Sequence, residues 1–376
     1  MSVFINSLTK LCPSYGLRFI YPYRGIHITQ VQQLYSISAL GIDGYLHARK
    51  KTREQFTNFS DKFRTKMTEF VSDSKNMIFT EDLKNMLHLA EPTDLELVKN
   101  MIKKFNTQKS EFRFGSFVFG PIVMRMFHFL DAPNDALKCF EDPDNNGFFD
   151  QLVSYQILLD LLYNHEMYDE MYKVFERVQE KQLSMTKFPK YSVVLILAAC
   201  YKQNTPSSLD YATKLWSEMI EVGTAPVRRA ATFMAALALN QGAPHLALES
   251  LVLQKPHYIT VRNIRALALA QLDRMDDALA VLRGVLEIDR PEQKDKHTFF
   301  EETITKVREA VEKSNNKDVL KEYENIENAL KDRGLIDKQT LDNLLASDIT
   351  LQTDKPKPPR GMPRMSYGHR QKKNIV

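Results

Sequence analysis

Residues 142–153, DPDNNGFFDQLV, carry side-chain oxygens at spacings that suit calcium coordination. The stretch matches a twelve-residue calcium-binding loop at Asp142, Asp144, Asn146 and Gly147, which correspond to early ligand positions and the sharp turn of such a loop. The twelfth position, where calcium needs a bidentate glutamate, is Val153. We therefore predict a turn between two helices at this point rather than a calcium site.

No other stretch has the residue spacing of a common catalytic or metal site. The sequence lacks the phosphate-binding GxxxxGK[ST] loop and the GxGxxG, HExxH and GxSxG motifs. Its three cysteines, Cys12, Cys139 and Cys200, lie too far apart for a zinc cluster or a disulfide framework. We predict a protein without catalytic residues, bound metal or cofactor.

Positive charge is concentrated at the two ends of the chain. Residues 1–42 contain Lys10, Arg18 and Arg24 and no acid, a composition typical of a mitochondrial transit peptide and therefore of the matrix. A flexible N-terminus is the alternative interpretation. Residues 355–376 contain seven Lys or Arg, four prolines and no acid, which predicts a disordered basic tail. Removing these +3 and +7 contributions from the total of +4 leaves a net charge of −6 on residues 43–354.

A second basic segment lies between Tyr45 and Lys66, where seven Lys or Arg accompany Phe56, Phe59 and Phe63. Basic and aromatic residues together suit single-stranded nucleic acid. At helical spacing, however, the phenylalanines are expected to face a core and the lysines to be solvated. The longest uncharged apolar run, VVLILAACY at 193–201, has 9 residues, whereas a membrane span needs about 20.

One pattern recurs along the body of the chain: a small or unbranched residue followed four positions later by a bulky apolar one. The first member of each pair is separated from the next by 35, 35, 41, 35 and 31 residues. These first members are Met101, Ala136, Met171, Ala212, Ala247 and Ala278. Such a period is typical of a helical-hairpin solenoid, because each hairpin must bury one face against the next. We predict an all-α superhelical solenoid of helix-turn-helix repeats.

The copy at residues 153–183 resembles a pentatricopeptide repeat along its whole length. VSY at 153–155 stands where that family usually has Val-Thr-Tyr, LLD at 158–160 stands for Leu-Ile-Asp, and VFE follows at 174–176. The copy departs at Glu166 and Met171, where the family usually has glycine and alanine. MIEVGTAP at 219–226 resembles the family's repeat ending, whereas residues 268–282 look as much like a tetratricopeptide repeat.

The resemblance implies single-stranded RNA as the partner, with about one base addressed by each hairpin. In the family, the fifth repeat position on the first helix reads the base together with the last residue of the repeat. These positions correspond here to Gln156 with closing residue Thr186, to Thr232 and to Asn263. Two further fifth positions hold Val194 and Pro121, whose side chains cannot hydrogen-bond a base. The tail adds candidates for salt-sensitive RNA attraction: Arg360, Arg364, Arg370, Lys372 and Lys373.

These observations define an expected organisation and two functional hypotheses. The expected parts are a transit peptide (1–42), an N-terminal helical region with a weak repeat (43–113), a degenerate repeat array (114–290), C-terminal capping helices (291–350) and a disordered basic tail (351–376). The resemblance implies a non-catalytic RNA-binding adaptor that assists maturation or stability of mitochondrial transcripts, working with a separate nuclease or the mitoribosome. The alternative is a protein–protein scaffold like a tetratricopeptide array, which the acidic body favours.

Overall fold

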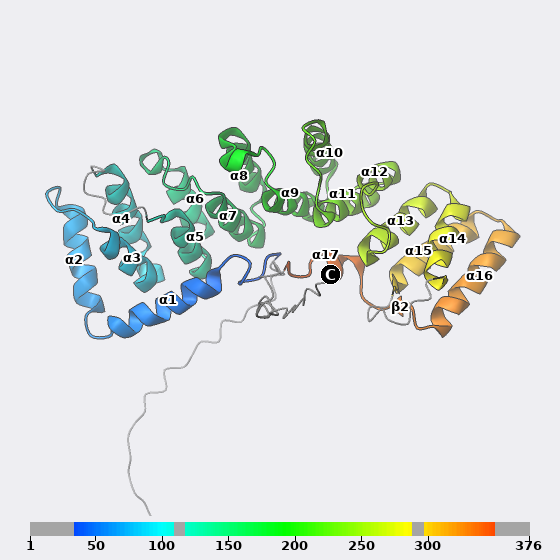
Figure 1. Cartoon of the computed structure of the whole chain (residues 1–376), viewed down its shortest axis with the longest axis horizontal. Helices are drawn as coiled ribbons and strands as arrows, with labels where there is room; N and C mark the ends of the chain where they lie inside the picture. Colours follow the sequence, from blue (N-terminus) through cyan, green and yellow to red (C-terminus); the bar gives the residue numbers. More distant parts are fainter. Residues whose placement is uncertain (1–33, 109–116, 288–296, 350–376) are drawn as a thin grey trace, which may run out of the picture. The chain divides into compact units, whose positions relative to one another are not determined.

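The computed structural model describes residues 34–108, 117–287 and 297–349. In these ranges the chain is almost wholly α-helical (Figure 1), and its two-residue strands β1 (Phe299–Phe300) and β2 (Ile336–Asp337) pair in parallel. The helices are α1 (Ile42–Gln55), α2 (Ser60–Ser72), α3 (Thr80–Leu89), α4 (Leu95–Thr107), α5 (Gly120–Phe129), α6 (Pro133–Glu141), α7 (Leu152–Asn164), α8 (Tyr168–Lys181), α9 (Lys190–Gln203), α10 (Pro206–Glu221), α11 (Arg228–Asn240), α12 (Pro244–Ser250), α13 (Ile259–Gln271), α14 (Met275–Leu286), α15 (Glu301–Lys313), α16 (Lys317–Asp332) and α17 (Leu341–Leu345).

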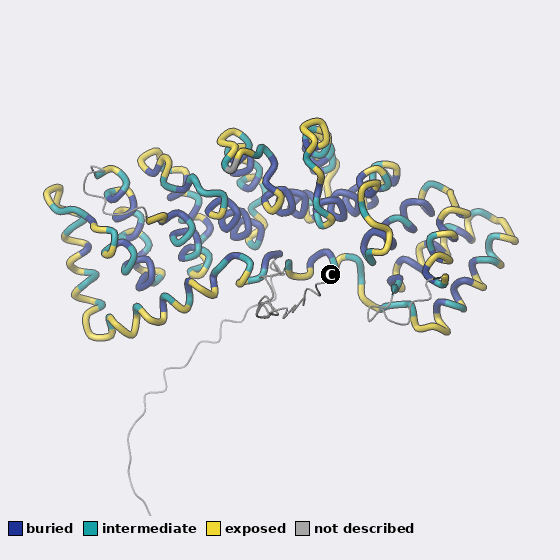
Figure 2. The backbone as a smooth tube through the Cα atoms, in the orientation of Figure 1, coloured by how far each residue is buried: buried dark blue, intermediate teal, exposed yellow. Residues whose placement is uncertain are grey.

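The helices pack as sequential hairpins, which confirms the predicted fold class. From α3 to α16, each odd-numbered helix packs against the helix that follows it. The odd-numbered helices also pack against one another, α5 on α7, α7 on α9, α9 on α11, α11 on α13 and α13 on α15. We call these six helices the first-helix row. Figure 2 shows that the row is largely buried, whereas the turns at the ends of α8 and α10 are exposed.

The recurring small-residue position explains how the hairpins close. All six predicted positions, from Met101 to Ala278, lie on the second helices α4, α6, α8, α10, α12 and α14 and have no exposed surface. A small side chain lets two helices approach, and the bulky residue four positions later lies on the same face and fills the space beside it. Four of the six are alanines, so the recurring position serves the packing of the two helices of each hairpin.

Each turn inside a hairpin contains one residue with left-handed backbone geometry. From α5/α6 to α15/α16 these residues are Asp131, Glu166, Asn204, Gly242, Asp273 and Asn315, with φ between 47° and 71°. Asn and Asp tolerate this conformation through local hydrogen bonding, and glycine adopts it without a Cβ clash. Glu166 has neither advantage, and it stands where the resembling family usually has glycine.

The calcium-like stretch forms the turn between α6 and α7, as predicted. Its first part is a short 3₁₀ helix, Pro143–Asn145, in which the Asp142 carboxylate accepts a hydrogen bond from the backbone N–H of Asp144. Lys103 from α4 lies 2.5 Å from the Asp144 carboxylate. The acidic side chains therefore hold the turn against the preceding hairpin.

The last hairpin, α15 and α16, packs with α13 and α14 around a second hydrophobic cluster that includes Val307, Tyr323 and Leu330. It joins the array through α13, whose Asn263 Oδ1 accepts a hydrogen bond of 2.9 Å from the backbone N–H of Phe300. Helix α16 ends at Asp332, and Gly334 follows with a φ of 62°. Glycine adopts this left-handed conformation without a Cβ clash, so Gly334 ends the helix.

We predict that Glu166→Gly stabilises the protein and Gly242→Ala destabilises it. A non-glycine residue with left-handed backbone costs about 1–2 kcal/mol, which outweighs the about 0.4–1 kcal/mol entropic cost of a glycine. A Cβ at Gly242 would meet no atom within 4 Å, so its effect reports backbone strain alone. Thermal and denaturant unfolding measure both variants. Equal stability of Glu166→Gly and the parent chain would contradict left-handed strain at this turn.

Candidate nucleic-acid interface

The open face of the first-helix row carries a stripe of polar and aromatic side chains. On each helix we take the fifth repeat position, the residue three before it and the residues four and seven after it, which share one helical face. We call this set the inner stripe. It comprises Val153, Gln156, Asp160 and Tyr163 on α7, Tyr191, Val194, Ala198 and Tyr201 on α9, and Arg229, Thr232, Ala236 and Leu239 on α11.

Two segments from opposite ends of the described chain meet beside this stripe. Tyr35 and Ile349 form a parallel β-bridge. The Ile349 backbone N–H donates to Leu34 O at 2.8 Å, and the Ser36 N–H donates to Ile349 O at 3.3 Å. We call residues 34–42 and 341–349 together the strap. Its second part contains α17, which packs against α11 and α13 (Figure 1).

The strap contacts both ends of the inner stripe on α9. The Tyr35 hydroxyl donates to Tyr191 O at 3.2 Å, and the two rings meet edge to face with centroids 6.0 Å apart. At the other end of α9, the Tyr201 hydroxyl donates to the carboxylate of Asp342. Val194, a fifth-position residue, lies between these contacts along the same face and is 2% exposed.

Arginines from two other first helices bind backbone carbonyls of the strap. Arg229 on α11 donates to Leu344 O at 2.8 Å and also to Ser347 O. Arg125 on α5 donates through Nε to Leu40 O at 2.8 Å. Burial lowers the pKa of both guanidinium groups from their usual value. The strap therefore provides hydrogen-bond acceptors for two partly desolvated cations.

The polar side chains around Tyr35 are incompletely paired. Burial, followed by the nearby Asp160 charge, raises the pKa of Tyr35, so its hydroxyl stays protonated and acts as a donor. Asp160 is fully buried and accepts a 3.0 Å hydrogen bond from His128 Nε2 through Oδ2. Asp160 Oδ1, Asn164 Oδ1, Ser192 Oγ and Arg229 Nε are buried without a hydrogen-bond partner. Each such atom costs about 1–3 kcal/mol.

The buried residues of the strap argue against a transit peptide that ends at residue 42. Leu34, Tyr35, Leu40 and Ile42 are each at most 4% exposed and belong to the main hydrophobic core. A presequence that ended at residue 42 would remove these core side chains with it. Residues 1–33 lie outside the described residues, and a transit peptide within them stays a prediction.

The four predicted reading residues have different surroundings. Gln156 is 9% exposed, lies one turn from the exposed Val153, and makes no hydrogen bond within the described ranges. Thr232 is buried, and its hydroxyl donates to Arg229 O at 2.9 Å. Thr186 is half-buried in the loop before α9, where its Oγ1 accepts from the Phe188 N–H. Among these predicted readers, Gln156 is therefore the one whose amide makes no hydrogen bond to the described residues, although the side chain is largely buried.

Asn263 is engaged at both ends of its amide. Its side chain has no exposed surface, its Nδ2 donates to Ile259 O at 2.8 Å, and its Oδ1 accepts from the Phe300 N–H. A base could reach this amide only after β1 had left α13. The geometry gives Asn263 a structural role in attaching the last hairpin.

Of the two predicted basic regions, the structure describes the segment from Tyr45 to Lys66. The five tail residues from Arg360 to Lys373 lie outside the described residues. In the segment from Tyr45 to Lys66, Arg49 and Arg53 contact Glu91, and Arg64 contacts Asp94. Phe63 packs against the core, whereas Phe59 is 59% exposed. Part of this segment's positive charge thus holds α1 and α2 in place.

The fifth-position rule missed the residues one and two turns further along each first helix. Arg125, His128, Asp160, Tyr163 and Tyr201 supply most of the polar and aromatic character beside the strap. Their signal was present in the sequence as polar residues four and seven positions after a fifth position. In an otherwise apolar helix, such residues mark a face that is not packed against other helices.

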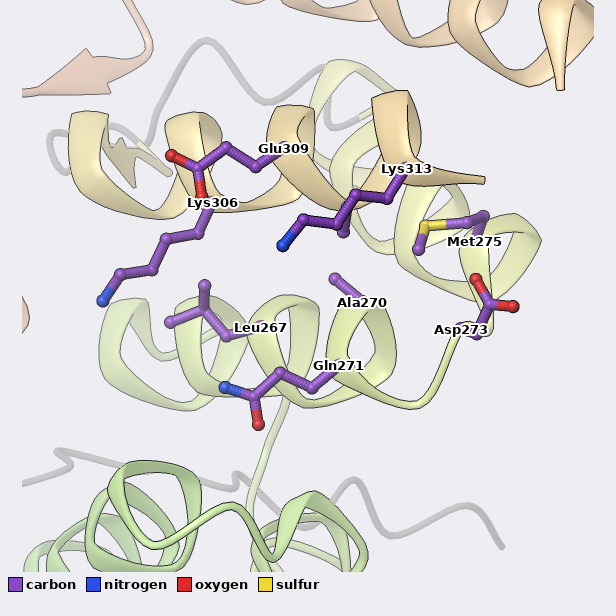
Figure 3. A pocket seen from close by; sticks show the side chains of 9 residues that line it. Leu267, Ala270, Gln271, Asp273, Met275, Lys306, Glu309 and Lys313 are labelled. Carbon is purple, nitrogen blue, oxygen red and sulfur yellow. The ribbon is translucent and has the colours of Figure 1, made fainter. Parts of the chain in front are cut away.

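Beyond the strap, the stripe continues as an open cavity. Leu267 and Ala270 follow Asn263 by four and seven residues and line a cavity of about 450 Å³ between α13 and α15 (Figure 3). Gln271 and Lys313 lie at its rim in the same view. Asp273 and Glu309 line the same cavity as Lys306 and Lys313, so its charges balance and the apolar floor has polar groups of both signs around it.

Among the described residues, no helix has the length and apolar character needed to cross a membrane. No protein-family model matches the chain. The chain is similar to vertebrate proteins named "Pentatricopeptide repeat-containing protein 2, mitochondrial". The human protein is 28% identical over 346 residues, which cover 90% of this chain and 83% of the relative. The mouse protein is 30% identical over 271 residues, 72% of this chain and 70% of the relative. The Xenopus laevis protein is 27% identical over 282 residues, 74% and 72% of the two chains.

These relatives share the predicted repeat resemblance and extend it over most of the chain, including the helices that flank the array. The chain belongs to the pentatricopeptide repeat-containing protein 2 family.

Proposed function

We propose that the protein is a non-catalytic RNA-binding adaptor of the mitochondrion. The observation that carries this proposal is the inner stripe, in which seven of the twelve residues are polar or aromatic on a row of helices that is otherwise apolar. Membership of a pentatricopeptide repeat family and relatives named mitochondrial add to it. Amide, guanidinium and phenol groups in one stripe match the edges, phosphates and faces of single-stranded bases.

The mechanism is passive. A single-stranded segment lies across consecutive first helices, which hold it in an extended form. A separate nuclease or the mitoribosome then meets that segment unfolded and protected from degradation. Because mitochondrial transcripts largely encode respiratory-chain subunits, loss of the protein is expected to lower respiratory-chain activity. The matrix is the compartment in which this mechanism operates.

The array and the tail differ in net charge, so we expect them to contribute differently to RNA binding. Residues 43–354 carry a net charge of −6, so the array attracts a polyanion weakly and must bind through specific contacts. The basic tail supplies general attraction, since its seven Lys or Arg can each replace a counterion on a phosphate. In this division, the tail holds the RNA near the protein and the array positions a segment of the same RNA.

A protein–protein scaffold is the second candidate, and one observation favours it. The inner stripe already contacts a polypeptide segment in this structure, because the strap lies on it. Crosslinking and recovery of RNA from mitochondria discriminates between the two functions. A discrete transcript segment supports the adaptor. Recovery of protein partners without RNA supports the scaffold.

We predict that Gln156→Ala weakens RNA binding while Asn263→Ala weakens the fold. The Gln156 amide makes no internal hydrogen bond, so its loss removes about 0.5–1.5 kcal/mol of binding and little stability. Asn263→Ala leaves the buried Phe300 N–H unpaired, which costs about 1–3 kcal/mol of unfolding free energy. Fluorescence anisotropy with single-stranded RNA and thermal unfolding separate the two effects. Unchanged RNA affinity in Gln156→Ala would remove it as a reader, and an unchanged melting temperature in Asn263→Ala would contradict its structural role.

We predict that truncation after Asp354 lowers the salt dependence of RNA binding more than its sequence preference. For a single strand, removing one Lys or Arg that binds a phosphate reduces the slope of log affinity against log salt by about 0.7. Titrations of the full and truncated chains at several salt concentrations measure the slope. If truncation abolishes the preference for one sequence over another, the tail rather than the array carries recognition.

A further inference from the structure

We propose that the strap and single-stranded RNA are alternative occupants of the inner stripe, so that RNA binds the array by displacing the strap. The inference rests on the proposed function, and it adds that the described conformation is the closed one. In this conformation two fifth-position residues, Val194 and Thr232, are at most 2% exposed. A base can reach them only if the strap moves.

The position of the strap follows the direction that a bound strand would take. It contacts α5 through Leu40, α9 through Tyr35 and Asp342, and α11 through Leu344 and Ser347. It therefore spans several first helices rather than one. A segment that crosses successive hairpins occupies the positions at which a repeat array meets its ligand.

The strap presents the same kind of groups that RNA would present. Arg125 and Arg229 each bind its backbone carbonyl oxygens, and an RNA strand offers phosphate and base oxygens to the same donors. Tyr35 places an aromatic ring edge to face against Tyr191, and an RNA base could meet the same tyrosine ring. Exchanging one occupant for the other therefore leaves both arginines with acceptors.

The strap buries Leu34, Tyr35 and Leu345 but leaves polar atoms beside it unpaired, which offsets part of the free energy needed to displace it. Asp160 Oδ1 and Arg229 Nε flank Tyr35 and have no hydrogen-bond partner. The two parts of the strap are joined to each other by two backbone hydrogen bonds near Ile349. A ligand with its own donors and acceptors can pair atoms that the strap leaves unpaired.

The test closes the strap covalently. Tyr35 and Ile349 are direct partners in a parallel bridge, and adjacent strands lie about 4.7–4.9 Å apart, within the range that a disulfide spans. The variant Tyr35→Cys with Ile349→Cys, in a Cys12→Ser background, locks the two parts together when oxidised. The same protein, reduced, lacks the Tyr35 ring and opens more readily. Cys139 and Cys200 are buried and free, so they stay out of the exchange.

RNA binding is measured with a random pool of fluorescent single-stranded RNA, using the variant in both redox states and the Cys12→Ser parent. The expected result is binding at least about tenfold weaker when oxidised than when reduced, as for a closed face that is open in about one tenth of molecules. The parent should fall between the two. Circular dichroism and thermal unfolding confirm that the array is intact in both states. As a matched control for loss of a buried tyrosine, Tyr323→Ala lies in the second hydrophobic cluster and should not tighten RNA binding.

The outcomes distinguish failure of the proposed competition from failure of the proposed RNA-binding function. Equal RNA affinity of the oxidised and reduced variant overturns the competition while the proposed function stands. Absence of RNA binding in the parent and in both states overturns RNA as the ligand. In that case, binding of a labelled peptide with the sequence of residues 34–42 to the reduced variant would identify the inner stripe as a polypeptide site.

Discussion

Close packing along the first-helix row is the constraint on which the other features depend. Each first helix is covered by its own second helix and by the first helices before and after it. The alanine-rich sequence of α11 permits this, and the central residues of α9 and α11 have almost no exposed surface. Only one stripe on each helix is left without a helical neighbour. Function in a solenoid of this kind is confined to that stripe.

The fold was predictable because its signal is local and repeated. The residues from Met101 to Ala278 are fully buried in second helices as the spacing indicated, since a period of about 35 residues gives each hairpin the same task. The turn at residues 142–153 and the end of α16 at Gly334 followed from local backbone chemistry. Glu166 marks the limit of such reasoning, because a helical hairpin accepts its left-handed strain when packing on both sides is strong.

The candidate site was predictable only in part, because its decisive contacts are remote in sequence. The side-chain amide of Gln156, selected by repeat position alone, makes no hydrogen bond to the described residues, but Asn263 is engaged by Phe300 from the next hairpin. The pairing of Tyr35 with Ile349 joins residues at opposite ends of the described chain. Neither residue belongs to a repeat, so no periodicity indicates the contact. A search of first helices for polar residues beyond the fifth position would have found Arg125 and Asp160, though not their partners.

The modular array allows the inner stripe to change occupant without unfolding. In a solenoid each hairpin contacts mainly its neighbours, so stability is a sum of local terms. The strap adds contacts to α9 and α11, but the packing between those two helices does not pass through it. Opening the strap therefore costs its own contacts, which include the buried Leu34, Tyr35 and Leu345, and leaves the packing between α9 and α11 in place. The last hairpin differs, because β1 is fixed to α13 by the buried Asn263 amide and cannot leave without exposing unpaired polar groups. The strap is thus a removable cover of the inner stripe, whereas the last hairpin, α15 and α16, is a fixed cap of the array.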